Sequence, residues 1–307
     1  MNVLVTGAAG LVGQNLIPSL KAGGVKIVAV DKHPTNTKIL ASLHPDVEVI
    51  EADLAEPGAW ERAAGECDAL IQLHAQIGGL DEDAFTRNNI VATRNVLAAC
   101  EAGRCAHIVH ASSSVINSAV VDFYTESKKA QEQLVTASPI ASAILRPTLM
   151  FGWFDRKHLG WLRRFMARAP LFPVPGHGRY PRQPLFAGDF SAIVRACLER
   201  RLTGVHDISG REVIDYIDLI RMIKEVAGLR TPIVKVPYRA FWLALKTYAV
   251  IDRDPPFTTK QLEALITPDM FPKTDWPSTF GVPATPLRKA LELTFQDERY
   301  ADVVLAY

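Results

Sequence analysis

Apolar and polar positions alternate in blocks along the first half of the chain. Short apolar runs of strand length occupy residues 3–5, 26–30, 47–51, 69–73, 107–110 and 143–145. Stretches with apolar residues at helical spacing lie between several of them, among them residues 11–20, 60–64 and 83–101. Buried strands that alternate with amphipathic helices are typical of a parallel sheet with helices on both faces. The pattern therefore predicts an α/β fold built on a doubly wound parallel sheet.

Three glycines follow the first strand at a spacing that suits a dinucleotide. Gly7, Gly10 and Gly13 form a G-x-x-G-x-x-G turn, and Leu11 and Val12 begin the helix behind it. Glycine lets the backbone turn tightly and approach a pyrophosphate, which the free N–H groups and the dipole of the helix N-terminus stabilise. Ordinary tight turns also contain glycines, so this interpretation depends on the residues that follow.

The second strand ends at Asp31, close to the position at which a carboxylate binds both ribose hydroxyls of a dinucleotide. Lys32 and His33 are able to touch a 2′-phosphate, but the charge of Asp31 would repel one. We therefore expect NAD rather than NADP as the cofactor. We expect residues 32–38 to form the loop around the adenosine ribose.

Polar residues also follow the third and fourth strands. Asp53 and Leu54 come after the third strand, where a polar residue either reaches the adenine edge or caps a helix. The fourth strand leads into residues 74–79, HAQIGG. Ligands bind at the carboxyl ends of the strands in open parallel sheets, so we expect this loop to line the site.

Tyr124 and Lys128 lie four residues apart in a stretch with helical character, so their side chains share one helix face. A lysine ammonium beside a phenol stabilises the phenolate, which lets the tyrosine transfer a proton near neutral pH. Such pairs are common on solvated helices. Here the pair follows the glycine turn and Asp31, and it lies just beyond a strand that ends in serines 112–114. We therefore interpret Tyr124 as an acid–base residue.

Several motifs together carry a resemblance to a known family. They are residues 6–13 (TGAAGLVG), 72–75 (QLHA), 89–97 (NIVATRNVL), 111–114 with Tyr124 and Lys128, 145–148 (LRPT), 151–152 (FG) and 183–189 (QPLFAGD). In this combination the chain resembles the extended short-chain dehydrogenase/reductases, the NAD-dependent epimerase/dehydratase family. The resemblance implies a Rossmann-type fold with a smaller C-terminal α/β substrate lobe, and often a homodimer formed by residues 83–101 and 124–136.

The resemblance also implies roles for single residues. The catalytic group would be Tyr124, Lys128 and Ser114, or Ser113 in its place. Further cofactor-binding residues would be Leu73, His74, Ala75, Asn89, Ser112, Pro147 and Thr148. Substrate-binding residues would be Gln76, Ser114 and Arg182, the last as a candidate for a diphosphate.

For the reaction, the resemblance implies hydride transfer at a ring carbon of a nucleotide-diphosphate sugar. We expect C4, and either a 4-epimerase or a 4-ketoreductase. The Asp-Glu pair of the sugar 4,6-dehydratases is absent, which counts against dehydration. Two alternatives stay open: a reductase or dehydrogenase of a lipid-linked sugar or sterol-like alcohol, and a non-catalytic NAD-binding subunit.

The composition changes after Phe151. Residues 153–168 carry cations among aromatic residues, which suits a diphosphate-bearing substrate or a solvated helix face. Residues 170–184 are rich in Pro and Gly and predict a loop, and residues 238–251 predict an apolar helix for a core, a dimer face or a membrane surface. We expect residues 1–150 to bind NAD, with 185–215 returning to that domain, and residues 151–184 and 216–307 to form the substrate lobe.

Overall composition narrows the class of protein. A length of 307 residues, 48% hydrophobic residues and a net charge of +1 favour a folded enzyme without a nucleic-acid partner. No signal peptide or membrane-spanning run is apparent, so we expect a cytoplasmic protein. The four cysteines, Cys67, Cys100, Cys105 and Cys197, show no spacing typical of a metal site, and we expect buried thiols and no metal.

Overall fold

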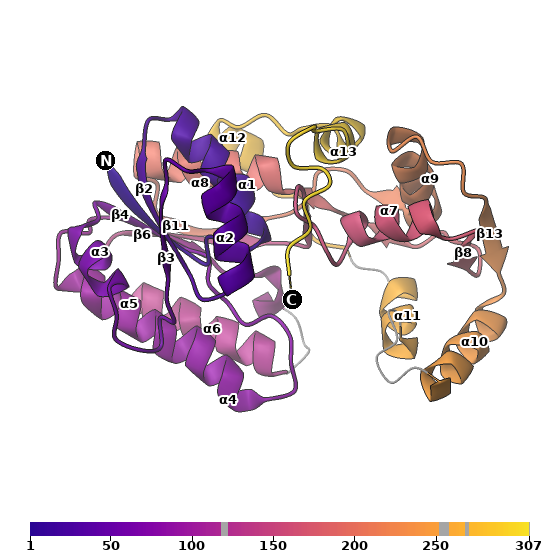
Figure 1. The fold of residues 1–307 in the computed structure, drawn as a ribbon, viewed down its shortest axis with the longest axis horizontal. Coiled ribbons are helices and arrows are strands. Elements are labelled where there is room, and N and C mark those ends of the chain that lie inside the picture. Colours follow the sequence, from indigo (N-terminus) through magenta and orange to yellow (C-terminus); the bar gives the residue numbers. More distant parts are fainter. Residues whose placement is uncertain (118–121, 252–257, 268–269, 307) are drawn as a thin grey trace.

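The computed structural model describes residues 1–117, 122–251, 258–267 and 270–306. Seven parallel strands form its central sheet in the order β11-β6-β5-β4-β1-β2-β3 (Figure 1). They are β1 (Asn2–Thr6), β2 (Lys26–Asp31), β3 (Glu48–Glu51), β4 (Ala69–Gln72), β5 (Ile108–Ala111), β6 (Ser142–Pro147) and β11 (Gly204–Ile208). The predicted doubly wound parallel sheet is confirmed.

Helices cover both faces of this sheet. On one face lie α1 (Leu11–Ala22), α2 (Pro34–Leu43), α8 (Ala187–Arg200) and α12 (Trp276–Phe280), and on the other lie α3 (Trp60–Glu66), α5 (Ala92–Glu101) and α6 (Phe123–Ala137). In β1, Val3 and Val5 pack in the first core and Leu4 in the second, and all three are fully buried. A strand with apolar residues on both faces needs a helical layer on each side, which explains the sandwich.

The predicted helix over residues 83–101 is divided into three pieces. Asp81 caps a short α4 (Glu82–Phe85), a π-helix η1 (Thr86–Val91) follows, and α5 completes the segment. The Asp81 carboxylate accepts the Asp83 amide at 3.1 Å, which fixes the start of α4. The π-helix brings Asn88 and Asn89 into the site described below.

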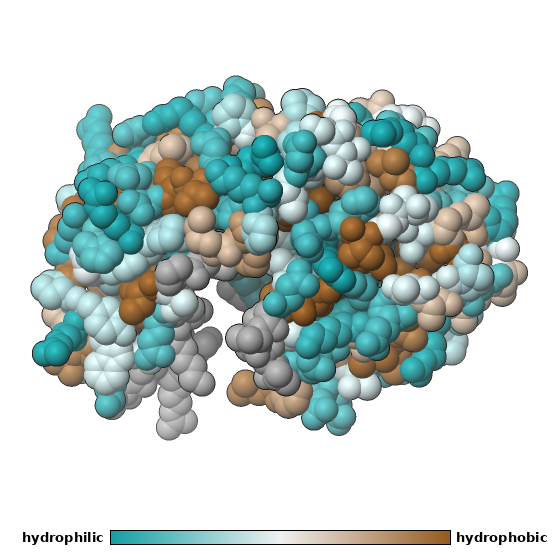
Figure 2. Space-filling view, turned by 180° about the vertical axis from the view of Figure 1, so that it is seen from behind, coloured by the Kyte–Doolittle hydropathy of each residue, from teal (hydrophilic) through white to brown (hydrophobic). Residues whose placement is uncertain are grey.

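The C-terminal lobe lies beside the sheet and has its own apolar core (Figure 1). Its helices are α7 (Leu159–Arg168), α9 (Tyr216–Val226), α10 (Tyr238–Ile251), α11 (Thr259–Ile266) and α13 (Leu287–Phe295). Short two-stranded ladders pair β7 (Met150–Phe151) with β10 (Leu185–Phe186), β8 (Phe172–Pro175) with β13 (Ile233–Val236), and β9 (Pro181–Arg182) with β12 (Ile214–Asp215). The space-filling view shows a notch between the lobe and the sheet part (Figure 2).

Two predicted loops contain regular structure. Residues 32–38 were expected to be loop, but α2 begins at Pro34, because His33 caps it and proline suits a first helical position. Residues 170–184 were also expected to be loop, but β8 and β9 lie within them. Proline is tolerated in β8 because this strand pairs on one side only, with β13, and lies at the edge of its ladder.

Among the described residues, no helix combines the length and the hydropathy needed to cross a bilayer. The segment between the serines and Tyr124 includes residues 118–121, which lie outside the described residues, as do Pro255 and Pro256.

Candidate active site

The glycine turn closes over the carboxyl edge of the sheet. Gly7 has a φ of 69°, and a Cβ there would lie 2.6 Å from the backbone nitrogen of His74. A Cβ on Gly13 would lie 2.4 Å from the carbonyl oxygen of Ala8. At Gly10 the nearest protein atom would be the Gly7 oxygen, at 3.4 Å. The turn is thus packed against protein at Gly7 and Gly13 and free at Gly10, which suits a pyrophosphate at the start of α1.

Asp31 lies beside this turn at the end of β2. Its carboxylate accepts hydrogen bonds from the backbone amides of Ala9, at 3.0 Å, and His33, at 3.1 Å. Burial raises the pKa of Asp31 above its ordinary value, and these amide hydrogen bonds oppose the rise. The acid and the glycine turn are therefore held together, as a ribose and pyrophosphate site would require.

Other candidate cofactor residues contact the π-helix. The Lys32 Nζ donates to the Asn88 side-chain oxygen at 2.6 Å, and Asp53 forms an ion pair with Arg87 at 3.0 Å. Leu54, the neighbour of Asp53, is buried in the core between the sheet, α3 and α5. Asp53 also accepts the Ala55 amide at 3.0 Å, so it stabilises its own turn whether or not it reaches an adenine.

Thr148 follows the last residue of β6, Pro147. Its amide donates to the Ile208 carbonyl at 2.9 Å, while its buried hydroxyl has no partner among the described residues. A buried polar atom without a partner is costly, so a ligand group that binds it would be favoured. This hydroxyl, the free side of Gly10 and the Asp31 carboxylate fit a bound NAD.

Tyr124 lies in the first turn of α6 and faces the serines that follow β5. Asp122 caps the helix by accepting the Thr125 amide at 2.7 Å. The half-buried Tyr124 hydroxyl forms a hydrogen bond with Ser113. Burial raises the pKa of Tyr124 and the Ser113 hydrogen bond opposes the rise, so the phenol is protonated at neutral pH. Ser114 begins a 3₁₀ turn, η2 (Ser114–Asn117).

Lys128 is almost fully buried, one helical turn after Tyr124. Its ammonium donates to the Ala111 carbonyl and to the Gln131 side-chain oxygen, both at 2.8 Å. An ammonium has three N–H donors, so one is left for a ligand hydroxyl. Burial lowers the pKa of Lys128 to about 7, and the nearby Glu132 charge opposes this.

A buried carboxylate that the sequence reading missed anchors this arrangement. Glu132 accepts the Ser112 hydroxyl at 2.7 Å and the Arg146 Nε at 3.1 Å. Arg146 also lies 3.9 Å from Asp207 of β11, so the pair joins α6 to the ends of β5, β6 and β11. The signal was present in the sequence, because Gln131 and Glu132 follow Lys128 at i+3 and i+4 on the same helix face.

Buried polar side chains continue from Lys128 to β1 and β4. His74 contacts the Thr6 hydroxyl at 2.8 Å and the Thr93 hydroxyl at 3.2 Å, and Gln131 donates to Thr93 at 2.9 Å. Burial and the Lys128 charge lower the pKa of His74 to about 3, so this ring is neutral. The half-buried His74 contacts Thr6 and Thr93, and the cofactor contact that the QLHA motif implies for it stays a prediction.

The loop after β4 is held by the π-helix. The Gln76 amide donates to the Asn89 side-chain oxygen at 2.5 Å, and Asn89 donates back to the Gln76 carbonyl at 3.1 Å. Asn89 also donates to the Ser127 hydroxyl at 2.8 Å on α6. The loop, the π-helix and α6 are therefore joined by the Asn89 side chain. The Gln76 side chain also bonds Asn88 and the Gly78 carbonyl. Leu73 and Ala75 flank His74 in this loop.

Exposed apolar side chains occur at the same edge. Ile77 is 58% exposed directly after Gln76, and Leu80 is 98% exposed three residues later. Phe123, beside Tyr124, and Leu149, beside Thr148, are each 43% exposed. Large apolar side chains next to three candidate site residues favour an apolar ligand at this edge.

Arg182 is engaged elsewhere in the lobe. Its guanidinium donates to the carbonyls of Pro181, at 2.9 Å, Thr267, at 3.1 Å, and Leu265. Arg182 thus ties β9 to the end of α11, and its diphosphate role stays a prediction.

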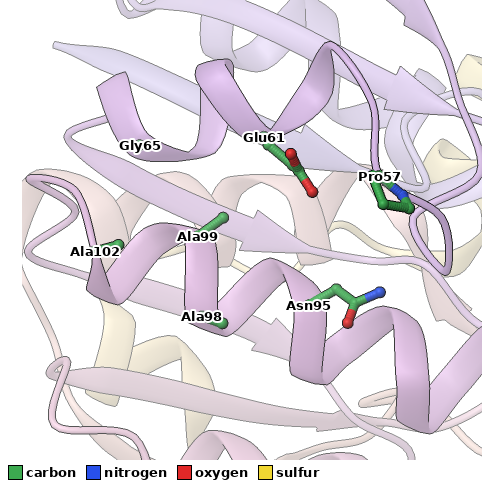
Figure 3. Close-up of a pocket in the computed structure, with 7 residues that line it drawn as sticks. All are labelled: Pro57, Glu61, Gly65, Asn95, Ala98, Ala99 and Ala102. Atoms are coloured by element: carbon green, nitrogen blue, oxygen red, sulfur yellow. The ribbon is translucent and has the colours of Figure 1, made fainter.

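A separate groove of about 480 Å³ runs between α3 and α5 (Figure 3). Its lining residues are Pro57, Glu61, Gly65, Asn95, Ala98, Ala99 and Ala102. It contains none of the candidate site residues and belongs to the helical layer on one face of the sheet.

Comparison with known proteins identifies a family, relatives and a solved structure to which this chain is similar. A profile of the NAD dependent epimerase/dehydratase family matches residues 3–209. The ceramide reductase of Caulobacter vibrioides is 27% identical over 245 residues, which cover 76% of this chain and 73% of the relative. A 2-alkyl-3-oxoalkanoate reductase of Shewanella oneidensis is 24% identical over 302 residues, which cover 87% of this chain and 76% of the relative. The UDP-glucose 4-epimerase structure from Thermotoga maritima has a TM-score of 0.74 and 18% identity, over 96% of this chain and 97% of its own, and thus shares the fold.

Proposed function

Because the chain belongs to the NAD-dependent epimerase/dehydratase family, with NAD as its cofactor, we propose that it interconverts a ketone and a secondary alcohol on an apolar, lipid-like substrate. The observation that carries the substrate class is the set of exposed apolar side chains beside the candidate site, Ile77, Phe123 and Leu149. The names of the two reductase relatives support it, since a ceramide and an alkyl-oxoalkanoate both carry long apolar chains.

The protonated Tyr124 carries the proton that a ketone reduction consumes. At neutral pH this phenol is the form that donates to a ketone oxygen as the alcohol forms. Ser113 would position that hydroxyl and share the developing charge, and the Lys128 ammonium would stabilise the phenolate that is left. NADH, when bound, would supply the hydride that the carbonyl carbon receives.

The residues that would hold the cofactor are those that have an uncovered face or an unused hydrogen-bonding group among the described residues. The free side of Gly10 and the amides at the start of α1 would receive the pyrophosphate, and Asp31 the adenosine ribose. The third N–H of Lys128 and the unpaired Thr148 hydroxyl would bind the nicotinamide end.

A nucleotide sugar, changed at C4 by epimerisation or keto reduction, is the second candidate. The shared fold with a UDP-glucose 4-epimerase supports it. Against it, Arg182 already binds three main-chain carbonyls. A non-catalytic NAD-binding role is disfavoured because Tyr124 hydrogen-bonds Ser113, and Lys128, one helical turn further on, is held by the Ala111 carbonyl at the end of the strand that precedes Ser113.

The two substrate classes can be separated by one assay. NADH oxidation would be followed with a long-chain 3-oxo acid, a long-chain 3-oxo amide, a steroid ketone and UDP-4-keto sugars, and UDP-hexoses would be tested for C4 inversion. We expect turnover with the long-chain ketones. Turnover of nucleotide sugars alone would overturn the proposal.

A variant pair sharpens this assay. Leu149→Asn should raise KM for the apolar ketone roughly tenfold, because burying a leucine contributes ~1.5–3 kcal/mol. Val234→Asn is the matched control, since Val234 is 41% exposed on β13 at the far end of the lobe. Equal KM values for the two variants would contradict the apolar site.

We further propose the domain division and assembly that the sequence suggests. The sheet with residues 185–215 would bind NAD, and residues 151–184 and 216–307 would select the substrate. A homodimer would form through α5 and α6, which pack against one another on the outer face of the sheet. Sedimentation equilibrium tests the dimer, and a monomer at all concentrations would contradict it.

A further inference from the structure

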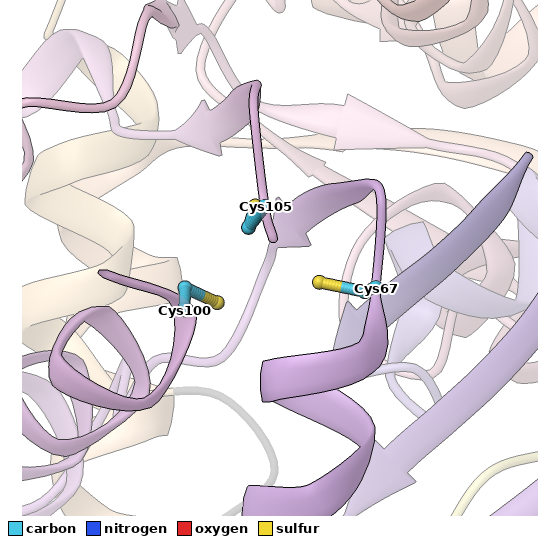
Figure 4. Close-up of side chains that lie close together, drawn as sticks. All are labelled: Cys67, Cys100 and Cys105. Atoms are coloured by element: carbon cyan, nitrogen blue, oxygen red, sulfur yellow. The ribbon is translucent and has the colours of Figure 1, made fainter. Parts of the chain in front are cut away.

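Three cysteines from three separate segments meet in one buried cluster. The Sγ atoms of Cys67, Cys100 and Cys105 all lie within 4.8 Å of one another (Figure 4). Their residues are 3%, 0% and 9% exposed. Figure 4 shows that they come from three separate segments, the end of α3, the last turn of α5 and the loop before β5.

The cluster lies at the opposite edge of the sheet from the candidate active site. Cys67 precedes β4 and Cys105 precedes β5, so both mark the amino ends of strands whose carboxyl ends carry Gln72 and Ala111. The surroundings are apolar side chains of the core between the sheet, α3 and α5, such as Leu70 and Ile108. Nothing in the proposed ketone reduction uses these thiols.

The spacing of the three sulfurs and their apolar surroundings together indicate which metal ion the cluster would bind. A metal–sulfur bond of ~2.3 Å in a trigonal arrangement separates the sulfurs by roughly 4.0 Å, which lies within the observed limit. A structural zinc site needs a fourth ligand, and the cluster offers three metal-binding side chains in an apolar core. Three thiolates without a fourth ligand suit a soft ion such as Cu(I).

Main-chain carbonyls lie beside two of the sulfurs. The Cys67 thiol donates to the Ala64 carbonyl at 3.2 Å, and the Cys105 thiol donates to the His107 carbonyl at 3.5 Å. A metal ion that binds the cluster must therefore displace the thiol protons.

We propose that Cys67, Cys100 and Cys105 form a buried trigonal site for a soft, thiophilic metal ion of the Cu(I) class. Binding of one Cu(I) forms three copper–sulfur bonds and releases the thiol protons to solvent, and no electron is transferred. The ion would tie α3, α5 and the start of β5 together, far from Tyr124. The site stands apart from the proposed reductase function.

The test is an anaerobic titration of the purified full chain with Cu(I) buffered by a chromogenic chelator. We expect one ion per chain, and a loss of affinity of at least tenfold in each of Cys67→Ser, Cys100→Ser and Cys105→Ser. Cys197→Ser is the matched control, because Cys197 is also fully buried but lies on α8 outside the cluster. Equal affinity in wild type, Cys100→Ser and Cys197→Ser would overturn the proposal.

A second measurement guards against a variant that fails to fold. The X-ray absorption spectrum of the wild-type copper complex should show three sulfur neighbours, and Cu(I) should raise its Tm but not that of Cys105→Ser. A preference for Zn²⁺ with four ligands would contradict the three-coordinate assignment. The rate of ketone reduction should change less than twofold when copper binds. The result of the copper titration therefore does not depend on the proposed activity.

Discussion

The sheet part and the C-terminal lobe use their cations in different ways. In the sheet part, Lys128 lies within a network of side chains, and Arg146 binds the carboxylate of Glu132. In the lobe, arginines donate to main-chain carbonyls: Arg164 to Asp155 and Arg156, and Arg182 to Pro181, Thr267 and Leu265. The sheet part therefore holds these cations beside the candidate site, while the lobe uses these arginines to hold its loops.

The largest expected effect tests the sheet part at its reacting group. Tyr124→Phe should lower kcat by roughly 10²–10⁴, because phenylalanine fills the space but cannot exchange a proton. Affinity for NADH in a fluorescence titration should stay within a few-fold. Tyr180→Phe is the control in the lobe, where the hydroxyl donates to the Pro175 carbonyl at 3.0 Å. It should cost about 1 kcal/mol of stability and leave kcat unchanged, and similar kcat values for both variants would remove Tyr124 from its role.

Two glycines of one turn should respond differently to the same change. Gly10→Val should abolish NAD binding without unfolding, because the added side chain meets the protein only at 3.4 Å and fills the pyrophosphate space. Gly13→Val should unfold the protein, because its Cβ would lie 2.4 Å from the Ala8 oxygen. Calorimetric titration with NAD and circular dichroism measure the two effects. A folded Gly10→Val that binds NAD normally would place the cofactor elsewhere.

The buried histidines of the sheet part predict a loss of stability in acid. His110 is fully buried, neither ring nitrogen has a partner among the described residues, and burial lowers its pKa well below 6.5. The unfolded chain then binds a proton that the folded one does not, so stability falls as the pH drops below 6.5. His110→Leu should raise stability by about 1–3 kcal/mol and flatten this slope in urea melts.

The smallest effect belongs to the lobe. Arg182→Ala should lower stability by about 1 kcal/mol, because its guanidinium tethers β9 to α11, and should not change affinity for UDP. Arg288→Ala, on a solvent-exposed pair with Glu225, should change neither. A tenfold loss of UDP affinity in Arg182→Ala, but not in Arg288→Ala, would indicate that Arg182 binds a diphosphate. It would contradict the view that the lobe arginines only hold loops.

Local patterns in the sequence predicted the sheet and supplied the candidates for the centre of the site. The glycine turn, Asp31 and the Tyr124–Lys128 pair were readable from their spacing along the chain, and their roles stay predictions. The sequence offered both Ser114 and Ser113 as the serine beside Tyr124 and could not choose between them, because the choice depends on where β5 ends and a 3₁₀ turn begins. The same holds for Arg182 and for the three cysteines, whose contacts join segments that only the folded chain brings together.

The π-helix at Thr86–Val91 has a consequence for the length of this segment. A π-turn holds one residue more than an α-turn, so removing a single residue there would let the helix run on as regular α-helix. Residues on either side of the deletion would keep nearly the same angle about the helix axis, because one turn of either helix covers 360°. The widened turn itself would be lost, and with it the present placement of Asn89 between Gln76 and Ser127. Loss of one codon in this segment should therefore leave α4 and α5 in place but weaken the contacts that Asn89 makes.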